Sequence, residues 1–444
     1  MSFDNLPCGW KLVTLEDAMD AIIDYRGKTP KKTESGIPLI TAKIVKGGYV
    51  LEPFEFIAED NYDSWMVRGL PQVGDVVLTT EAPLGETAQL TSSNVALAQR
   101  IVTLRGKKGL LDNDFLLCAL QSDFVQHQLE SRASGSTVKG IKQSELRKVS
   151  LPIPPLHQQK KISQVLKSLS NKLVCNTQTN QILEQMAQAI FKSWFVDFDP
   201  VKAKMNGGQP EGMDGATASL FPEKLDSETG IPVGWSQGII EDIAKLNAKS
   251  WTKKNQPEQV HYVDLANTKN GVIETVTTYD FDEAPSRARR VLNSGDTIVG
   301  TVRPGNRSFA FIGETEQPLT GSTGFAVLSP KEEFWTSFVY LATTNDDAID
   351  EYARLADGGA YPAIKPVVVA DTPCVIPTTD IAQKFWQLTG AMLKKAHQNR
   401  LENEELAKLR DTLLPKLLSG EIELGTTEVM EPQLLVASPT EQYL

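Results

Sequence analysis

The stretch LPCGWKLVTLED at residues 6–17 returns later in the chain as IPVGWSQGIIED at residues 231–242. Both copies carry Gly-Trp in the same place and end in Glu-Asp, and the offset between them is 225 residues. A second pair of matching stretches begins with Gly74-Asp75 and Gly295-Asp296, at an offset of 221. A repeat of this length indicates one long module used twice, not a solenoid of short repeats.

Each copy of the module begins with a region of short β-branched runs and turns and ends with a long helical segment. Gly-Asp before VVLT and before TIVG is typical of a turn that leads into a strand, and Pro-rich stretches precede both helical segments. We therefore predict an α+β fold in which two β-rich globular domains are joined by two long helices. These helices are expected to form an antiparallel coiled-coil spacer, and the whole chain to be an internal pseudo-two-fold repeat. The expected boundaries are 1–155 and 231–377 for the β-rich domains, 156–196 and 378–420 for the spacer helices, 197–230 for a linker, and 421–444 for an acidic, disordered tail.

The two helical segments share a seam of apolar residues spaced mostly three and four apart, which is typical of a coiled coil. The seam of the first segment consists of Ile162, Val165, Leu169, Leu173, Leu183, Met186, Ile190 and Trp194. At an offset of 223, the seam of the second segment consists of Phe385, Leu388, Met392, Ala396, Leu406, Leu409, Leu413 and Leu417. At about 1.5 Å per residue such a seam is roughly 48 Å long, which suits a rigid spacer. The alternative is that each helix simply fills the core of its own domain.

Both seams are interrupted at the centre by a pair of asparagines, Asn176 and Asn180 in the first segment and Asn399 and Asn403 in the second. In an antiparallel pair, Asn176 is expected near Asn403 and Asn180 near Asn399. Polar residues on a seam lower stability but fix the register of the helices. Replacing all four with Leu is therefore expected to raise thermal stability and to loosen the register.

Charge and cysteine content narrow the class of protein. The chain has 45 Lys and Arg against 56 Asp and Glu, for a net charge of −11, which excludes a generally basic nucleic-acid coat protein but not a local DNA-binding face. Its four cysteines are far apart and form no CxxC pair, so a reducing, cytoplasmic location is expected. No run of about 20 apolar residues is present, so no membrane span is expected.

Two similar domains at a fixed separation suit a ligand with two similar sites, such as B-DNA, whose major groove returns to one face about every 34 Å. Loop cations are the candidate contacts: Lys28, Lys31 and Lys32 in DYRGKTPKK, Lys249, Lys253 and Lys254 in KSWTKK, and Arg303 and Arg307 around Pro304-Gly305. Two matched loops add Ser136, Thr137, Lys139 and Lys142 in SGSTVKGIK, and Lys365 in GGAYPAIK. Small residues there could let backbone N–H groups approach phosphate. The competing interpretation is that surface loops carry such groups for solubility.

Motifs of catalysis are missing from the sequence. SGSTVKGIK is not a P-loop, because Ile141 stands where that motif requires Lys. There is no HExxH, no GxSxG and no Cys/His spacing typical of zinc. We therefore expect a non-catalytic chain without a metal or cofactor of its own.

The chain resembles the specificity (S) subunit of type I restriction–modification enzymes. The resemblance spans about residues 6–420 and is carried by the two Gly-Trp starts together with five further stretches. These are ASGSTVKGI at 133–141, LPIPPLHQQKKI at 151–162, WFVDFDPVKAKMNG at 194–207, GGAYPAIK at 358–365 and LRDTLLPKLLSGEI at 409–422.

The resemblance implies two target recognition domains, each reading one half of a bipartite double-stranded DNA target, with the helical spacer setting the gap. It implies two methyltransferase (M) subunits and restriction (R) subunits as partners, with S-adenosylmethionine bound by M and with ATP and Mg serving R. The usual product is adenine methylated by M. It also adds Lys43 and Tyr361 to the candidate DNA contacts beside Lys28 and Arg303.

Two other classes of function remain open at this point. One is a non-catalytic, two-headed adaptor that binds proteins, which the mildly acidic domains favour and which a salt-dependent affinity for DNA would contradict. The other is an enzyme with an unrecognised site, for which alanine substitutions in the loops would abolish turnover without changing DNA binding.

Overall fold

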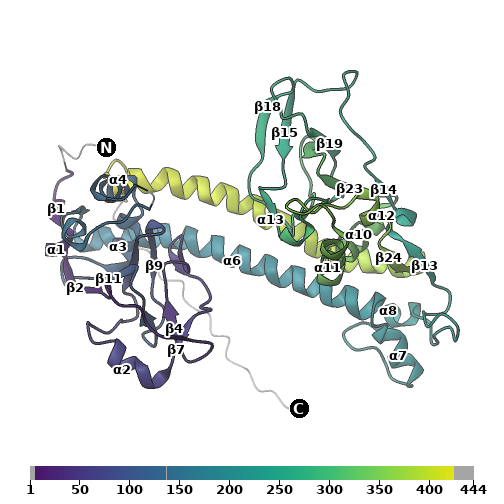
Figure 1. Cartoon of the computed structure of the whole chain (residues 1–444), viewed down its shortest axis with the longest axis horizontal. Helices are drawn as coiled ribbons and strands as arrows, with labels where there is room; N and C mark the ends of the chain where they lie inside the picture. The colour runs from purple at the N-terminus through teal and green to yellow at the C-terminus, as the bar shows by residue number, and fades with distance from the viewer. Residues whose placement is uncertain (1–5, 137, 425–444) are drawn as a thin grey trace, which may run out of the picture. The chain divides into compact units, whose positions relative to one another are not determined.

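The structure is a computed structural model that describes residues 6–136 and 138–424. The chain divides into unit 1, Met1–Leu173 with Glu405–Leu444, and unit 2, Val174–Glu404. Two helices of 40 residues each, α6 (Leu156–Phe195) and α13 (Thr379–Leu418), contribute one part to each unit (Figure 1). The expected fold class, with two β-rich parts and two long helices, is confirmed.

Unit 1 is built on two four-stranded sheets. One has the order β2 (Met19–Asp24), β11 (Ile101–Gly106), β8 (Val76–Thr80) and β9 (Leu84–Gln89), with antiparallel neighbours throughout. The other has the order β10 (Ala96–Leu97), β4 (Ile37–Ile40), β7 (Phe56–Ile57) and β3 (Lys32–Thr33), in which β10 and β4 are parallel. Two-stranded sheets pair β1 (Lys11–Thr14) with β12 (Ser150–Ile153) and β5 (Val45–Lys46) with β6 (Tyr49–Val50). The helices besides α6 and α13 are α1 (Leu15–Ala18), α2 (Tyr62–Trp65), α3 (Asn113–Leu120), α4 (Asp123–Arg132), α5 (Gln143–Leu146) and the 3₁₀ turn η1 (Glu59–Asn61).

The central strand β8 is buried on both faces because a different layer covers each one. Val76 and Leu78 lie in the cluster that contains α3 and α4, whereas Val77 lies in the cluster of the second sheet. All five residues of VVLTT are buried. A run of mostly β-branched residues without an apolar–polar alternation is typical of such a two-sided position.

Unit 2 repeats this plan. Its first sheet has the order β14 (Ala244–Leu246), β23 (Phe325–Pro330), β20 (Thr297–Gly300) and β21 (Phe309–Phe311). Its second sheet has the order β18 (Thr277–Asp280), β15 (Gln259–Val263), β22 (Leu319–Ser322) and β19 (Ala288–Leu292), in which β15 and β22 are parallel. Two-stranded sheets pair β13 (Ser236–Ile239) with β24 (Pro373–Ile376) and β16 (Thr268–Lys269) with β17 (Val272–Ile273). The remaining helices are α7 (Asp199–Met205), α8 (Gly215–Leu220), α9 (Ile240–Ile243), α10 (Thr336–Thr344), α11 (Asp346–Leu355), α12 (Pro366–Ala370), η2 (Pro304–Asn306) and η3 (Glu333–Trp335).

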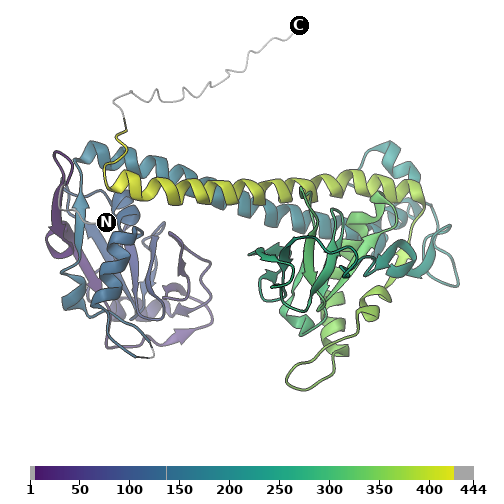
Figure 2. The same cartoon turned by 90° about the horizontal axis from the view of Figure 1, so that it is seen from above.

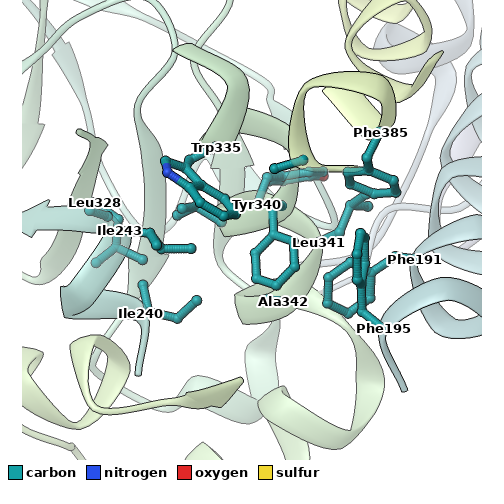
Figure 3. Close-up of a cluster of buried hydrophobic side chains, with 14 of the residues drawn as sticks. Phe191, Phe195, Ile240, Ile243, Leu328, Trp335, Tyr340, Leu341, Ala342 and Phe385 are labelled. Carbon is teal, nitrogen blue, oxygen red and sulfur yellow. The ribbon is translucent and has the colours of Figure 1, made fainter. Parts of the chain in front are cut away.

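Aromatic side chains join the long helices to the rest of unit 2. Phe195 of α6 lies 4.8 Å from Phe385 of α13 and 4.9 Å from Phe338 of α10, measured between ring centroids. Figure 3 shows Phe195, Phe385 and Trp335 in this cluster. Edge-on ring pairs of this kind add to the stabilisation that comes from burial alone.

The segment 197–230, which we expected to be a linker, is folded against unit 2. It contains α7 and α8, and Val201 and Phe221 have 0% and 2% of their surface exposed. Phe221 lies 4.9 Å from Trp194 of α6, between ring centroids. The linker was predicted because NGGQPEGMDG is rich in turn-forming residues. The buried apolar side chains of Val201 and Phe221 lie on either side of that stretch and pack the segment into unit 2.

Three of the expected seam residues face solvent and correct the predicted seam. Met186, Leu388 and Leu409 have 47%, 42% and 47% of their surface exposed. Ala187 and Thr389 are fully buried, each at 0%. The three-and-four spacing runs through the asparagines without a break, so next to Met186 and Leu388 the buried position moves by one residue, onto the small Ala187 and the polar Thr389.

The expected acidic tail lies mostly outside the described residues, since the description ends at residue 424. Ile422 and Leu424 pack against the core of unit 1. None of the helices within residues 6–136 and 138–424 combines the length and the apolar character needed to cross a membrane.

Candidate nucleic-acid interface

In unit 2, backbone hydrogen bonds fasten glycine loop 2, which we define as residues 356–364, to the end of strand β20. The Ile364 N–H donates to the Thr301 carbonyl at 2.9 Å. Within the loop, the Ala363 N–H donates to the Asp357 carbonyl at 2.8 Å. The loop protrudes from unit 2 on the side away from α13 (Figure 2). Its position is therefore set by the sheet, and its tip is open to a partner.

Arg303, in the turn between β20 and β21, stacks on the tip of glycine loop 2. Its guanidinium carbon lies 4.6 Å from the centroid of the Tyr361 ring. Its Nη2 donates to the Ala360 carbonyl at 2.8 Å, and its backbone N–H donates to the Pro362 carbonyl at 2.7 Å. Arg303 has φ 49°, in the left-handed region, and Tyr361 is 70% exposed. The pair forms an exposed cation–aromatic surface.

Unit 1 contains the same arrangement in glycine loop 1, which we define as residues 133–141. The Ile141 N–H donates to the Thr80 carbonyl at 3.0 Å, and the Gly140 N–H donates to the Ser134 carbonyl at 3.0 Å. The Arg26 Nη1 donates to the Ile141 carbonyl at 2.6 Å. The exposed candidates on or beside this loop are Ser136, Lys139 and Lys142, and Thr137 lies outside the described residues.

Both loops depend on a glycine in the left-handed region. Gly135 has φ 119° and Gly358 has φ 123°. A Cβ on Gly135 would lie 2.1 Å from the Val138 carbonyl oxygen, and one on Gly358 would lie 2.9 Å from the Tyr361 carbonyl oxygen. Any other residue would open the turn, because these distances are shorter than real Cβ contacts.

The four candidate lysines in the first half of unit 1 do not form one patch of unpaired charge. Lys28 and Lys31 are exposed, but the Lys32 Nζ lies 2.8 Å and the Lys43 Nζ 3.5 Å from the same oxygen of Glu55. The hydrogen bond from Lys32 is the main cause that holds the pKa of Glu55 below its ordinary value. Glu55 thus neutralises part of the local positive charge.

The KSWTKK segment of unit 2 runs beside strand β19. The Trp251 N–H donates to the Arg289 carbonyl at 2.8 Å, and the indole Nε1 donates to Thr320 Oγ1 at 2.9 Å. Its three candidate lysines, Lys249, Lys253 and Lys254, are exposed. Burial lowers the pKa of the neighbouring Arg290. Trp251 therefore anchors the segment, while its lysines remain accessible.

Arg307 is tied to neighbouring side chains. Its Nη2 lies 2.7 Å from an oxygen of Asp346, its Nε donates to Asn270 Oδ1 at 2.9 Å, and its guanidinium carbon lies 5.6 Å from the centroid of the Phe309 ring. These contacts fix the hairpin turn. Lys365, in contrast, is exposed at the residue before α12.

The four seam asparagines meet across the two helices inside unit 2. The Asn176 Nδ2 donates to Asn403 Oδ1 at 2.9 Å, and the Asn399 Nδ2 donates to Asn180 Oδ1 at 2.8 Å. Asn176 also donates to Glu402 Oε2 at 2.8 Å. The pairing places α6 and α13 antiparallel in this unit.

Sequence reasoning missed Ala82, the position in unit 1 that corresponds to Arg303. Ala82 has φ 50° and precedes Pro83, as Arg303 precedes Pro304. The sequence shows this correspondence, because Thr80 and Pro83 match Thr301 and Pro304 at an offset of 221 residues.

Within residues 6–136 and 138–424, no group of three or more His, Cys, Asp or Glu side chains is placed to hold a metal ion.

The chain is similar in sequence to known proteins. Residues 7–185 match the family described as the type I restriction modification DNA specificity domain. The type I restriction enzyme HindI specificity subunit of Haemophilus influenzae is 25% identical over 380 residues, covering 74% of this chain and 82% of that protein. The MjaIX specificity subunit of Methanocaldococcus jannaschii is 24% identical over 434 residues, covering 94% of both chains.

A solved structure supports the fold. The crystal structure of the S subunit of a type I restriction–modification system from M. genitalium superposes with a TM-score of 0.55 at 16% identity, covering 93% of this chain and 96% of that one. The resemblance of this chain to the specificity subunits of type I restriction–modification enzymes is thereby confirmed, in sequence along nearly its whole length and in fold.

Proposed function

We propose that the chain binds double-stranded DNA as the specificity subunit of a type I restriction–modification complex. Each unit reads one half of a bipartite target through its glycine loop and the adjoining hairpin turn. The observation that carries the proposal is the repeated geometry of the two loops. The same backbone bonds, Ile141 to Thr80 and Ile364 to Thr301, hold loops whose exposed side chains differ. A common scaffold with different side chains is what two unlike half-sites require.

The catalysis belongs to the partners in this proposal. Two methyltransferase subunits bind S-adenosylmethionine and methylate the target, and restriction subunits use ATP and Mg to cleave DNA. The length and register of the helical spacer set the gap between the two halves of the target. The chain itself directs both reactions without a catalytic group.

A methylation map tests the proposal. The chain is co-expressed with the methyltransferase subunit of its own system in a host without DNA methylation, and modified adenine is located by sequencing. One split motif with a fixed gap supports the proposal. An unmodified genome, although the complex is folded and assembled, contradicts it and favours the protein adaptor.

A matched pair of variants locates the contact in unit 1. Replacing Lys139 and Lys142 with Ala is expected to weaken DNA binding and to reduce the slope of log affinity against log salt by about 2, since each phosphate contact contributes about 1. Lys148, which is paired with Glu145 at 2.7 Å, is the control, and Lys148→Ala is expected to leave the slope unchanged. Equal slopes for all three proteins would remove glycine loop 1 from the interface.

A further inference from the structure

The most constrained exposed cation among the candidate contacts is Arg303. A non-glycine residue with φ 49° carries backbone strain, and such strain is concentrated at functional sites. Glycine would relieve this strain, yet the position holds a long, charged side chain. The strain is tolerated because Arg303 is tied at its backbone to the Pro362 carbonyl and at its side chain to Ala360.

The same contacts fix the plane of the guanidinium. Tyr361 supports one face of the group at 4.6 Å, and the Ala360 carbonyl accepts from Nη2 at 2.8 Å. A guanidinium has five N–H donors, so this single hydrogen bond leaves four for a ligand. Within the described residues no carboxylate is paired with Arg303, whereas Arg307 nearby is paired with Asp346 at 2.7 Å. Arg303 thus presents an uncompensated planar fork whose orientation is set before binding.

We propose that Arg303 is a specificity-determining residue that reads a guanine in the half-site bound by unit 2. The inference rests on the proposed function and adds the base class to it. An arginine fork matches the O6 and N7 acceptors of guanine in the major groove, and this is the commonest base-specific contact of arginine. The same fork can also pair bidentately with a phosphate, whereas a lysine such as the exposed Lys365 contacts phosphate as a point charge. Only the guanine contact makes the loss on substitution depend on one base position.

The repeat predicts that unit 1 cannot make this contact. Ala82 occupies the position of Arg303 with nearly the same φ, 50°, and Val138 occupies that of Tyr361. Neither the fork nor the ring that supports it is present there. The guanine contact therefore belongs to one half-site only.

The test uses the complete methyltransferase complex and three forms of the chain: the parent, Arg303→Ala and Arg303→Lys. Methylation maps are expected to show one guanine position, in one half of the motif only, relaxed by both substitutions. Lys keeps the charge but loses the fork, so Arg303→Lys is expected to relax the same position. With 7-deazaguanine at that position, which lacks N7, the parent is expected to lose about 10- to 100-fold in affinity, while the variants change little.

Controls separate base reading from charge and from misfolding. Lys365→Ala is expected to weaken binding to all sequences equally and to reduce the salt slope by about 1, with the motif unchanged. Thermal melting of each complex checks that the variant folds, and Arg303→Lys serves as the second variant if Arg303→Ala melts early.

Three results overturn the inference and can be told apart. If Arg303→Ala and Arg303→Lys both leave the methylated motif unaltered, Arg303 reads no base. If Arg303→Ala weakens binding to all sequences equally and lowers the slope of log affinity against log salt by about 1, Arg303 contacts a phosphate. In both cases the inference fails and the proposed function stands. If the parent complex neither binds nor methylates DNA, the proposed function fails and this inference fails with it.

Discussion

The hydrogen bond between Asn399 and Asn180 allows a quantitative test of how the helices are held in register. Asn399 is 2% exposed and donates to Asn180 Oδ1 at 2.8 Å, while Asn180 donates to the Ala396 carbonyl at 3.1 Å. Asn180 is only partly buried. Replacing one partner with Leu leaves the amide of the other without its hydrogen bond, and the burial of that amide decides the cost.

Asn180→Leu is expected to be the more costly single substitution. It leaves the fully enclosed Asn399 amide without an acceptor, which costs about 2–3 kcal/mol, at the upper end of the range for an unsatisfied buried group. Asn399→Leu leaves Asn180, which can turn to water, at a cost of about 1 kcal/mol. The double substitution leaves neither amide unpaired and buries two Leu side chains, each contributing about 1.5 kcal/mol. The double variant should therefore be more stable than either single variant.

Native-state hydrogen exchange of peptides from α6 and α13 measures these changes locally in the full chain, without assuming that the two units unfold together. Gln181→Leu, at an exposed position of the same helix, is the control and is expected to change the opening free energy by less than about 0.5 kcal/mol. If the free-energy changes of Asn180→Leu and Asn399→Leu add up to that of the double variant within about 0.5 kcal/mol, the two side chains are not coupled and the reasoning is refuted. A larger cost for Asn399→Leu than for Asn180→Leu would refute the assignment of burial.

Four further predictions concern the loop, the sheets and the core. Gly135→Ala is expected to reduce DNA affinity with little change in melting temperature, because the Cβ would displace the loop tip alone; a DNA titration with parallel melting curves decides this. Asp75→Asn is expected to destabilise unit 1 by about 3 kcal/mol, since it breaks a 2.8 Å pair with Arg105 in which the carboxylate is 1% exposed. Burial raises the pKa of the matched Asp296, so the stabilisation that its neutral carboxyl gives to unit 2 is fully present below about pH 4 and is lost as the pH rises through the folded pKa. Asp296→Asn should therefore stabilise unit 2 at pH 7 and have no such effect in acid, as urea unfolding at both pH values would reveal. Phe195→Ala is expected to cost about 3–5 kcal/mol in the free energy of unfolding of unit 2, whereas no loss would contradict its place in the aromatic cluster.

The parts of the fold that the sequence predicts are those that depend on period and repetition. The 3–4 spacing of apolar residues predicts both long helices, and α6 and α13 are continuous over 40 residues each. The same reasoning misplaced Met186, because a periodic pattern favours the larger apolar residue over its neighbour Ala187. Burial is decided by the helix angle, which the asparagines keep in phase, and not by side-chain size.

Contacts between residues far apart in sequence could not be predicted in this way. Arg303 and Tyr361 were each candidate contacts, but their stacking depends on how glycine loop 2 is fastened to the end of β20. The pairing of Lys43 with Glu55 likewise needs a fold before it can be stated, and it changes the charge that Lys43 offers to a ligand. Sequence alone gives a list of cations; the structure divides it into paired and unpaired ones.

The repeat also explains how one scaffold can serve two different ligand surfaces. Backbone groups make the bonds that fasten the glycine loops to the sheets, Ile141 to Thr80 and Ile364 to Thr301, so these bonds do not depend on the side chains at the loop tips. Ala82 and Arg303 have nearly the same φ, 50° and 49°, but differ completely in what they can contact, and the side chains of Val138 and Tyr361 differ in the same way. A substitution at these positions can therefore change recognition without disturbing the sheet beneath. Under the proposed function, transplanting the side chains of one loop tip onto the other should transfer a base preference and leave the fold intact, whereas loss of folding would mean that side chains hold the loops after all.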